Sequence, residues 1–256
     1  MLCGIISNSN QKVVARQVTK DYAPFHCEGC GHELVLKKGN IKVHHFAHKP
    51  PHGCSRGQGE SEAHRKCKET IYFELMKQGN VTDLDIEKDL GAVVADLYCK
   101  IDGVPVAIEV QRSNLSVNQI TARTSEYCKL GVNVLWLALF DKKLNDDKYN
   151  PTAWMKWCHA AYFGRVFYWI GELNLLPVHY GEYRLDVPES TWYETGGVER
   201  SEGGYTRPSK RYKTPSFGKV HNIAKDFEPA FKKPWSGGAI VIPKCRLYVS
   251  KHRKWW

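Results

Sequence analysis

The sequence predicts an α+β fold whose central part, residues 60–140, has the element order αβββαβ. Two apolar, β-branched runs flank Asp102-Gly103, and such a pair of residues between strands is the strongest short-range signal for a β-hairpin. Apolar residues recur at helical spacing in the preceding residues 60–78. After the hairpin, a second helical segment leads into the continuous apolar run 132–140, which is typical of a buried strand.

The predicted hairpin brings two acidic residues together. If Asp102-Gly103 forms a two-residue turn, Asp96 lies opposite Glu109, and Gln111 shares their face of the sheet, while the other face is apolar. Like charges opposite each other destabilise a sheet, so a neutralising cation is expected. Two carboxylates about 5 Å apart suit Mg²⁺ or Mn²⁺. The alternative is a solvated face on which the acids only keep the sheet soluble; the pairing geometry favours the metal site.

Length and composition limit the class of protein. The chain has 256 residues, enough for one large domain or two small ones. It contains no apolar run long enough to span a membrane and no signal-peptide pattern. Nine cysteines, several of them within apolar strand or helix patterns, indicate a reducing compartment with thiols and a metal site rather than a disulfide framework. A cytoplasmic protein without membrane association is therefore expected.

The positive charge is concentrated in the last part of the chain. The net charge is +10, and residues 199–256 hold 14 Lys and Arg against 4 Asp and Glu, so the first 198 residues are neutral. A basic tail of this kind is typical of an electrostatic arm for nucleic acid. A solubilising tail is almost as well supported.

The first 57 residues predict a hairpin followed by a small zinc-ribbon-like module. Residues 1–15 read as two short strands around a polar turn. Cys27-x-x-Cys30 and then His45-x-x-His48 offer two thiolates and two imidazoles, the ligands of a closed, structural Zn²⁺ site. Such a short segment buries little core, so the metal would supply its folding energy. His44 and Cys54 are rival ligands, and a redox CxxC is the weaker alternative.

The helical stripe of residues 60–78 begins with Glu60 and His64 before it becomes apolar. Polar groups on a core-facing stripe need partners. Glu60 would find one in the Asp96/Glu109 metal; a surface acid favoured by the helix dipole is the alternative. Residues 81–86 predict a short strand, and Ser116 with Gln119 forms a capping box that opens the second helix, which Gly131 closes.

Beyond residue 142 the pattern is weaker. Residues 143–198 form an aromatic-rich extension with a helix at 151–164 and a strand at 165–170. Residues 194–218 are rich in Gly, Ser, Pro and charge, which predicts flexibility in the basic tail 199–256. Within this tail, basic residues alternate with Tyr and Trp, a pattern that suits phosphate attraction and base stacking. Lys210, Arg211 and Lys213 are therefore candidate nucleic-acid contacts.

Residues 22–140 carry a resemblance to a known family. The matching motifs are Cys27-x-x-Cys30, His45-Phe46-Ala47-His48, Glu60-Ser61-x-x-His64-x-x-x-Lys68, Ala95-Asp96, Ile108-Glu109-Val110-Gln111-x-Ser113 and Arg123-x-x-x-Tyr127. In this order they resemble the competence protein CoiA family, within the PD-(D/E)xK nuclease superfamily. The resemblance implies a restriction-endonuclease-like core over residues 58–142. It implies a Mg²⁺- or Mn²⁺-dependent nuclease that acts on DNA, single-stranded or branched, with recombination or DNA-uptake proteins as partners.

By this resemblance, Asp96 and Glu109 bind the catalytic cation, and Glu60 is the helix acid. Gln111 stands where the superfamily usually has lysine, and a glutamine can hydrogen-bond but cannot supply the lysine's charge. Lys68 could return that charge. His64 would act as a general acid or base or would orient Glu60. Ser113 and Arg123 are candidate nucleic-acid contacts.

Gln111 also favours a second hypothesis, a catalytically weak nuclease fold that only binds DNA. A third is a recruitment factor that uses the zinc module and the aromatic C-terminal half to assemble a DNA-uptake or recombination machine. A cleavage assay with Mn²⁺ separates the first hypothesis from the other two, and the salt dependence of DNA binding separates the second from the third.

Overall fold

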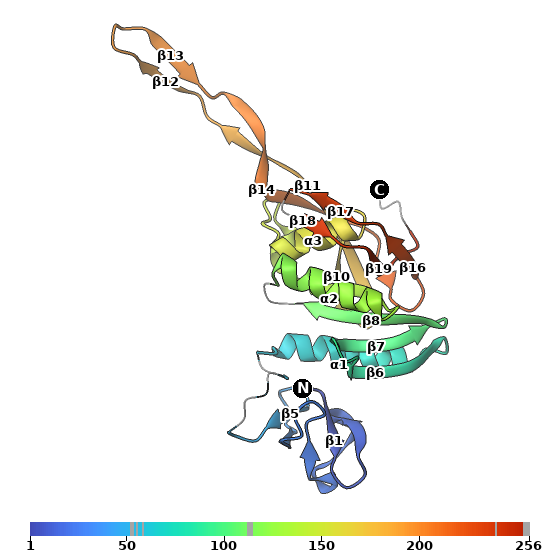
Figure 1. Ribbon diagram of the computed structural model, residues 1–256. Coiled ribbons are helices and arrows are strands. Elements are labelled where there is room, and N and C mark those ends of the chain that lie inside the picture. The colour runs from blue at the N-terminus through green and yellow to red at the C-terminus, as the bar shows by residue number, and fades with distance from the viewer. Residues whose placement is uncertain (52–53, 55, 58, 112–114, 239, 253–256) are drawn as a thin grey trace.

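The computed structural model describes residues 1–51, 54, 56–57, 59–111, 115–238 and 240–252. Its described part is a mixed α+β structure, mostly strands, with three α-helices. A five-stranded N-terminal sheet lies beside a ten-stranded central sheet (Figure 1). Ser113, a candidate nucleic-acid contact, lies outside the described residues.

The N-terminal sheet is a small module. Its strands are β1 (Cys3–Ile6), β2 (Gln11–Val14), β3 (Phe25–His26), β4 (Glu33–Lys37) and β5 (His45–His48), in the order β2-β1-β3-β4-β5, and the short turns η1 (Ala15–Gln17) and η2 (Lys20–Tyr22) follow β2. The predicted first hairpin is present as β1 and β2. The core of the module is built around Phe25 and Phe46, whose rings lie 5.0 Å apart. This core is small, which agrees with the expectation that a metal helps to hold the module together.

The central part has the predicted order αβββαβ. Its elements are α1 (Glu62–Met76), β6 (Val81–Asp89), β7 (Val94–Ile101), β8 (Val104–Gln111), α2 (Val117–Lys129) and β9 (Asn133–Leu139). The hairpin register is the predicted one, from Ile101 opposite Val104 to Leu97 opposite Ile108. Buried and half-buried residues alternate along β7, as expected for one apolar face. On β8, however, Glu109 is also buried, because α2 covers the second face of that strand.

The helix ends are set by local capping. Ser61 is the N-cap of α1 and accepts a hydrogen bond from the backbone of His64 (3.2 Å). Glu60 therefore lies two residues before the first residue of the helix, and the prediction that placed it on the helix is wrong. The capping box of Ser116 and Gln119 is present at α2, and Gly131 follows that helix with φ +74°. A positive φ of this kind favours glycine because it has no Cβ.

The C-terminal half completes the central sheet. Its elements are η3 (Lys142–Asn145), α3 (Ala153–Ala161), β10 (Val166–Gly171), β11 (Asn174–Val187), β12 (Ser190–Tyr193), β13 (Glu199–Glu202), β14 (Tyr205–Phe217), β15 (His221–Asn222), β16 (Phe227–Lys232), β17 (Trp235–Gly237), β18 (Ile240–Ile242) and β19 (Cys245–Ser250). The main path of the sheet runs β14-β11-β10-β9-β8-β7-β6. Strands β11 and β14 leave the body as a long two-stranded ribbon with β12 and β13 at its tip (Figure 1).

The predicted flexible tail is instead part of the fold. Residues 194–218 include β13 and all of β14, which pairs with β11. Strand β19 lies parallel to β9, with Leu247 opposite Val134, and Leu247 is fully buried in the main core. The prediction failed because the local composition of 194–218 is polar, whereas its strands are stabilised by pairing, β13 with β12 and β14 with β11. No helix within the described residues is both long and apolar enough to span a membrane.

Candidate metal centre and active-site pocket

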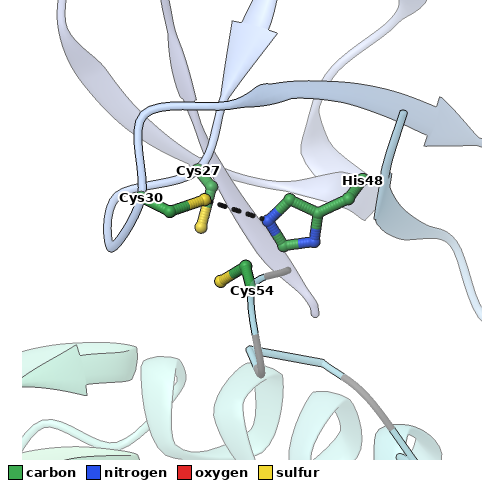
Figure 2. Close-up of side chains that lie close together, drawn as sticks. All are labelled: Cys27, Cys30, His48 and Cys54. Carbon is green, nitrogen blue, oxygen red and sulfur yellow. Dashed lines mark hydrogen bonds between the residues drawn. The ribbon is translucent and has the colours of Figure 1, made fainter. Parts of the chain in front are cut away.

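Four metal-type side chains meet at one edge of the N-terminal module. The ligand atoms of Cys27, Cys30, His48 and Cys54 all lie within 4.8 Å of one another. Figure 2 shows the four side chains converging from the turn after β3, the strand β5 and the segment that leads to α1. In a tetrahedral Zn²⁺ site with bonds of about 2.3 Å, sulfur ligands are roughly 3.8 Å apart. Three cysteines and one histidine at these separations fit a structural zinc site.

The turn between the two cysteines is held by the backbone. The Gly31 amide donates to the Cys27 carbonyl and the Cys27 amide donates to the His32 carbonyl, each at 2.9 Å. Burial opposes ionisation of the Cys30 thiol, but hydrogen bonds from His32, His48 and Cys54 outweigh it and lower its pKa to about 6. The Cys30 Sγ lies 3.3 Å from His48 Nε2 (Figure 2). The thiolate is the form that binds a metal.

His45 is not part of this cluster, so the predicted fourth ligand is corrected to Cys54. His45 and His48 are the ends of strand β5. Side chains alternate between the two faces of a strand, so residues three positions apart point to opposite sides. His45 turns away and its Nδ1 donates to the Val43 carbonyl (2.8 Å). Cys54, the rival ligand, supplies the position instead.

A pocket of about 470 Å³ lies between the N-terminal module and the central part. The central part contributes Glu60, His64, Lys68, Glu87, Val94, Asp96 and Arg123, and the N-terminal part contributes Met1, Cys3, Cys27, Glu28, Arg56, Gly57 and Gly59. The pocket is therefore a two-sided site in which predicted catalytic residues face the metal-binding module. Arg56 also forms an ion pair with Asp89, which joins the two walls.

A buried lysine is at the centre of the charged residues of this pocket. Lys68 Nζ lies 2.5 Å from Glu60, 2.8 Å from Glu87 and 3.4 Å from Asp96. Burial alone would favour the neutral amine, but the neighbouring carboxylates outweigh it and raise the pKa of Lys68 well above its usual value. Lys68 is thus a permanent cation held among three acids.

Asp96 is held by hydrogen bonds with helix α1 and strand β8. Its Oδ2 accepts from the Val110 amide (2.9 Å) and lies 3.2 Å from His64 Nε2. Burial disfavours the ionised carboxyl, yet Lys68, then His64 and the Val110 amide, hold the pKa of Asp96 well below its usual range. The Val110 amide therefore donates to the Asp96 side chain at the end of the β7–β8 strand pair, and the aspartate stays charged.

Glu109 has a different environment. Its Oε1 accepts hydrogen bonds from Arg123 (2.5 Å) and from the Tyr127 hydroxyl. Burial is the largest influence on its pKa and, with the charge of Asp96, raises it to about 7 against the opposing effect of Arg123. The charge of Asp96 thus acts on Glu109, and the pKa values of the two acids are shifted in opposite directions.

Glu87 is a member of the site that sequence reasoning missed. It is a buried residue of β6 with φ +53°, and its carboxylate accepts from the Leu2 amide (2.9 Å), the Cys3 amide (3.2 Å) and Lys68 (2.8 Å). Burial opposes its ionisation, but Lys68 outweighs it and lowers the pKa of Glu87 to about 2. No sequence signal marked it, because its partners come from a helix and from a different module.

The remaining predicted residues are more dispersed. Gln111, half-buried at the end of β8, is not among the described residues that line the pocket. Arg123 lines it, but its guanidinium binds Glu109 and the Val94 carbonyl (3.0 Å). Lys210, Arg211 and Lys213 lie on β14, at the opposite edge of the main sheet from β6. Within the described ranges, the Cys/His cluster is the one group of three or more metal-type side chains with ligand atoms this close.

Two family models match this chain. The N-terminal domain of competence protein CoiA matches residues 7–56, and the nuclease-like domain of competence protein CoiA matches residues 60–164. The chain has no match among the curated proteins or the solved structures. The first match contains all four metal-type ligands, and the second contains Glu60, Lys68, Glu87 and Asp96 of the pocket. Because the two matched segments follow each other and together cover more than half of the sequence, this chain belongs to the competence protein CoiA family.

Proposed function

We propose that the chain is a Mg²⁺- or Mn²⁺-dependent nuclease that hydrolyses phosphodiester bonds of DNA at Asp96. The observation that carries this proposal is the convergence of Asp96, Glu60 and Lys68 in one pocket. All three lie in the segment that matches the nuclease-like domain. The order αβββαβ of that segment, with Asp96 on the second strand and Glu109 on the third, supports a PD-(D/E)xK core.

Asp96, which lines the pocket, and the neighbouring buried Glu109 fit a hard divalent cation. Asp96 is ionised, and Glu109 carries a carboxyl whose pKa is raised to about 7 by burial and by the neighbouring charge of Asp96. Oxygen ligands of this type are preferred by Mg²⁺ and Mn²⁺. Asp96 and Glu109 would hold the ion, with Glu60 nearby, and the bound ion would supply an activated water and neutralise phosphate charge.

Lys68 takes the role that Gln111 cannot fill. Its ammonium lies 3.4 Å from Asp96 and lines the pocket, so a scissile phosphate beside Asp96 would meet a fixed positive charge. Because its pKa is raised, Lys68 acts as an electrostatic group and not as a base. Gln111 would at most orient a water by hydrogen bonding.

His64 fits an orienting role better than a proton-transfer role. Its Nε2 lies 3.2 Å from Asp96 and its Nδ1 lies 3.4 Å from Glu60. An imidazole with an acid on either ring nitrogen fixes both carboxylates in place. The N-terminal cluster would hold one structural Zn²⁺ through Cys27, Cys30, His48 and Cys54, and this ion would stabilise the module that forms the other wall of the pocket.

The proposal is tested by cleavage of single-stranded, double-stranded and branched DNA with Mg²⁺, Mn²⁺ and EDTA. Asp96→Ala and Glu109→Ala should each abolish cleavage, and the double variant should be no worse, because the two residues act as a unit. Lys219→Gln, an exposed residue remote in sequence from the pocket segment, is the control and should cut normally.

A DNA-binding module without catalysis is the second candidate. It is favoured by Glu109, whose Oε1 already accepts from Arg123 and Tyr127. If the wild type binds DNA but cuts nothing with any of these metals, this second function replaces the first.

A further inference from the structure

We propose that the ribbon of β11 and β14 carries a second nucleic-acid site, which binds single-stranded DNA through Lys148, Tyr183, Lys210, Arg211 and Tyr212. This inference rests on the proposed function only for the choice of DNA as ligand. The five side chains are hereafter called the ribbon site. It lies outside the pocket of Asp96 and outside the segment that matches the nuclease-like domain, except for Lys148.

The ribbon site is built on a large irregularity in the strand pairing. Glu182 is opposite Lys213 and Arg184 is opposite Pro208, so the single residue Tyr183 faces residues 209–212. The extra residues form a bend, in which the buried Ser209 hydroxyl accepts from the Tyr212 amide (2.9 Å). Lys210 and Arg211 are exposed at this bend. Bulges of this kind re-aim side chains and are built features of a sheet.

Two tyrosines and two cations lie against one another at the bend. The rings of Tyr183 and Tyr212 meet edge to face, with centroids 6.1 Å apart. Lys148 Nζ lies 4.4 Å from the centroid of Tyr212 and 6.0 Å from that of Tyr183, and Arg211 Cζ lies 5.2 Å from the centroid of Tyr212. Lys148 and Arg211 thus lie over an aromatic ring and remain exposed. This cation–π contact positions the two positive charges without neutralising them.

Lys148 is fixed to the ribbon by its neighbour. The Tyr149 amide donates to the Lys213 carbonyl (2.9 Å), and the Lys213 amide donates to the Tyr149 carbonyl (2.8 Å). Tyr149 is buried, and its ring stacks on Tyr180 of β11 at 5.7 Å. The loop that carries Lys148 therefore cannot move away from the bend without breaking buried contacts. A rigid site loses less entropy on binding.

The charge of the ribbon site selects a polyanion. Lys148, Lys210, Arg211 and the adjacent Lys213 are positive. Glu182, the acid that precedes Tyr183 on β11, forms an ion pair with Arg184 (2.8 Å). Half-buried tyrosines beside exposed cations are the combination with which proteins bind single strands, in which bases stack on the rings and phosphates meet the cations. A duplex hides its base faces, so it would use the cations alone.

The position of the ribbon site gives a length requirement. Strand β14 is five strand spacings from β7 across the sheet, about 24 Å at roughly 4.8 Å per spacing, and Tyr183 lies five residues along β11 from Val178, which is level with Asp96, about 17 Å at roughly 3.4 Å per residue. The two components give about 29 Å, so at roughly 3.4 Å per stacked nucleotide a strand that reached from the ribbon site to Asp96 would need about nine nucleotides. The ribbon site would thus hold a single strand whose continuation lies in the pocket.

The test is fluorescence anisotropy of a labelled single-stranded oligonucleotide and of its duplex, both in EDTA so that cleavage does not enter. Tyr212→Leu should weaken single-strand binding roughly five- to 150-fold, the range for loss of one base stack, and should change duplex binding much less. Lys148→Gln and Arg211→Gln should each reduce the slope of log K against log salt by about 0.7 for the single strand. Tyr205→Leu and Lys219→Gln, outside the ribbon site, are the matched controls.

Folding is checked by thermal melting, and the exposed Lys148→Gln and Arg211→Gln variants serve if Tyr212→Leu does not fold. Single-strand binding as tight as that of the wild type in folded variants would overturn the proposal. An equal loss of affinity for single strand and duplex in Tyr212→Leu would also overturn it, because the tyrosine would then not stack on an exposed base. Loss of single-strand binding in a protein that never cuts DNA would sustain the ribbon site and reject only the nuclease activity.

Discussion

At the scale of single residues, Glu87 connects the pocket with the N-terminal module. It binds Lys68 on one side and the amides of Leu2 and Cys3 on the other. A carboxylate that accepts this many hydrogen bonds in a buried place is strongly favoured in its ionised form. The geometry of Lys68, and through it that of Asp96, therefore depends on a residue that would touch neither metal nor phosphate.

The pKa of Glu87 gives a stability prediction with a definite sign. It falls from 4.5 to about 2 on folding, so the stabilisation is present above about pH 4.5 and is lost as the pH falls toward 2. Glu87→Gln should reduce the free energy of unfolding at neutral pH by on the order of 3 kcal/mol, and the difference from the wild type should narrow on acidification. Urea unfolding at several pH values measures this, with the exposed Glu194→Gln as control. A difference that does not depend on pH would contradict the assignment.

The pKa of Glu109 is shifted in the opposite direction from that of Glu87, and it predicts how metal binding depends on pH. Its pKa is raised to about 7, so below that pH a cation must displace a proton before Glu109 can bind it. The affinity for Mn²⁺ should rise with pH up to about 7 and then level off, and Glu109→Gln should remove this dependence. Titration calorimetry at several pH values measures both. Equal pH dependence in the wild type and the variant would show that Glu109 is not a ligand.

At the scale of elements, the β7–β8 hairpin could be predicted and its environment could not. Asp102-Gly103 sets the register by itself, so Leu97 lies opposite Ile108 as expected. The burial of Glu109 depends on Tyr127 of α2, which is a tertiary contact. Local sequence contains the turn and the alternation of faces, but it does not contain the helix that covers one of those faces.

In the metal cluster, too, spacing predicted part of the site and the tertiary structure decided the rest. His48 and the Cys27-x-x-Cys30 turn were recognisable from spacing, whereas the last ligand depends on which face of the strand each histidine takes. Cys54→Ser should therefore lose the zinc and destabilise the module, while His45→Ala should keep about one zinc per chain. Metal analysis of the two purified variants decides the matter. Zinc retained in Cys54→Ser and lost in His45→Ala would restore the original ligand set.

At the scale of the whole molecule, the basic C-terminal part closes the central sheet. Strand β19 pairs with β16 and with β9, and Leu247 and Val249 are buried. Composition suggested a tail because its many lysines and arginines dominate the count, while the short apolar strand among them is only visible once its partner β9 is known.

Removal of residues 227–256 should consequently unfold the protein or lower its melting temperature strongly, because it removes buried side chains such as Leu247 and exposes an edge of β9. Replacement of the ribbon tip, residues 190–202, by a short turn should leave the melting temperature nearly unchanged, since all of β12 and β13 is exposed. Thermal unfolding compares the two deletions. A stable protein without β19 would mean that the C-terminal part is the tail that its composition suggested.

The pocket forms only where the N-terminal module and the central part meet. Asp96, Glu109, Glu60, His64 and Lys68 were identified from motif spacing, and four of the five line the pocket. The wall formed by Arg56 and Glu28, and the link through Glu87, required the placement of the N-terminal module against the core. Residues in contact across two modules have no fixed sequence separation, which is why sequence reasoning identified candidate residues of one wall but not the opposite wall of the pocket.

The central claim is that the protein cleaves DNA with a cation held by Asp96 and Glu109. The most direct measurement is Mn²⁺-dependent cleavage of labelled single-stranded DNA by the wild type and by the variants Asp96→Asn and Lys68→Gln. The wild type should cut with Mn²⁺ and not with EDTA. Asp96→Asn should bind the DNA without cutting it, and Lys68→Gln should cut at least roughly 100-fold more slowly, as expected for loss of a positioned electrostatic group. Cleavage by Asp96→Asn at the wild-type rate would contradict the account.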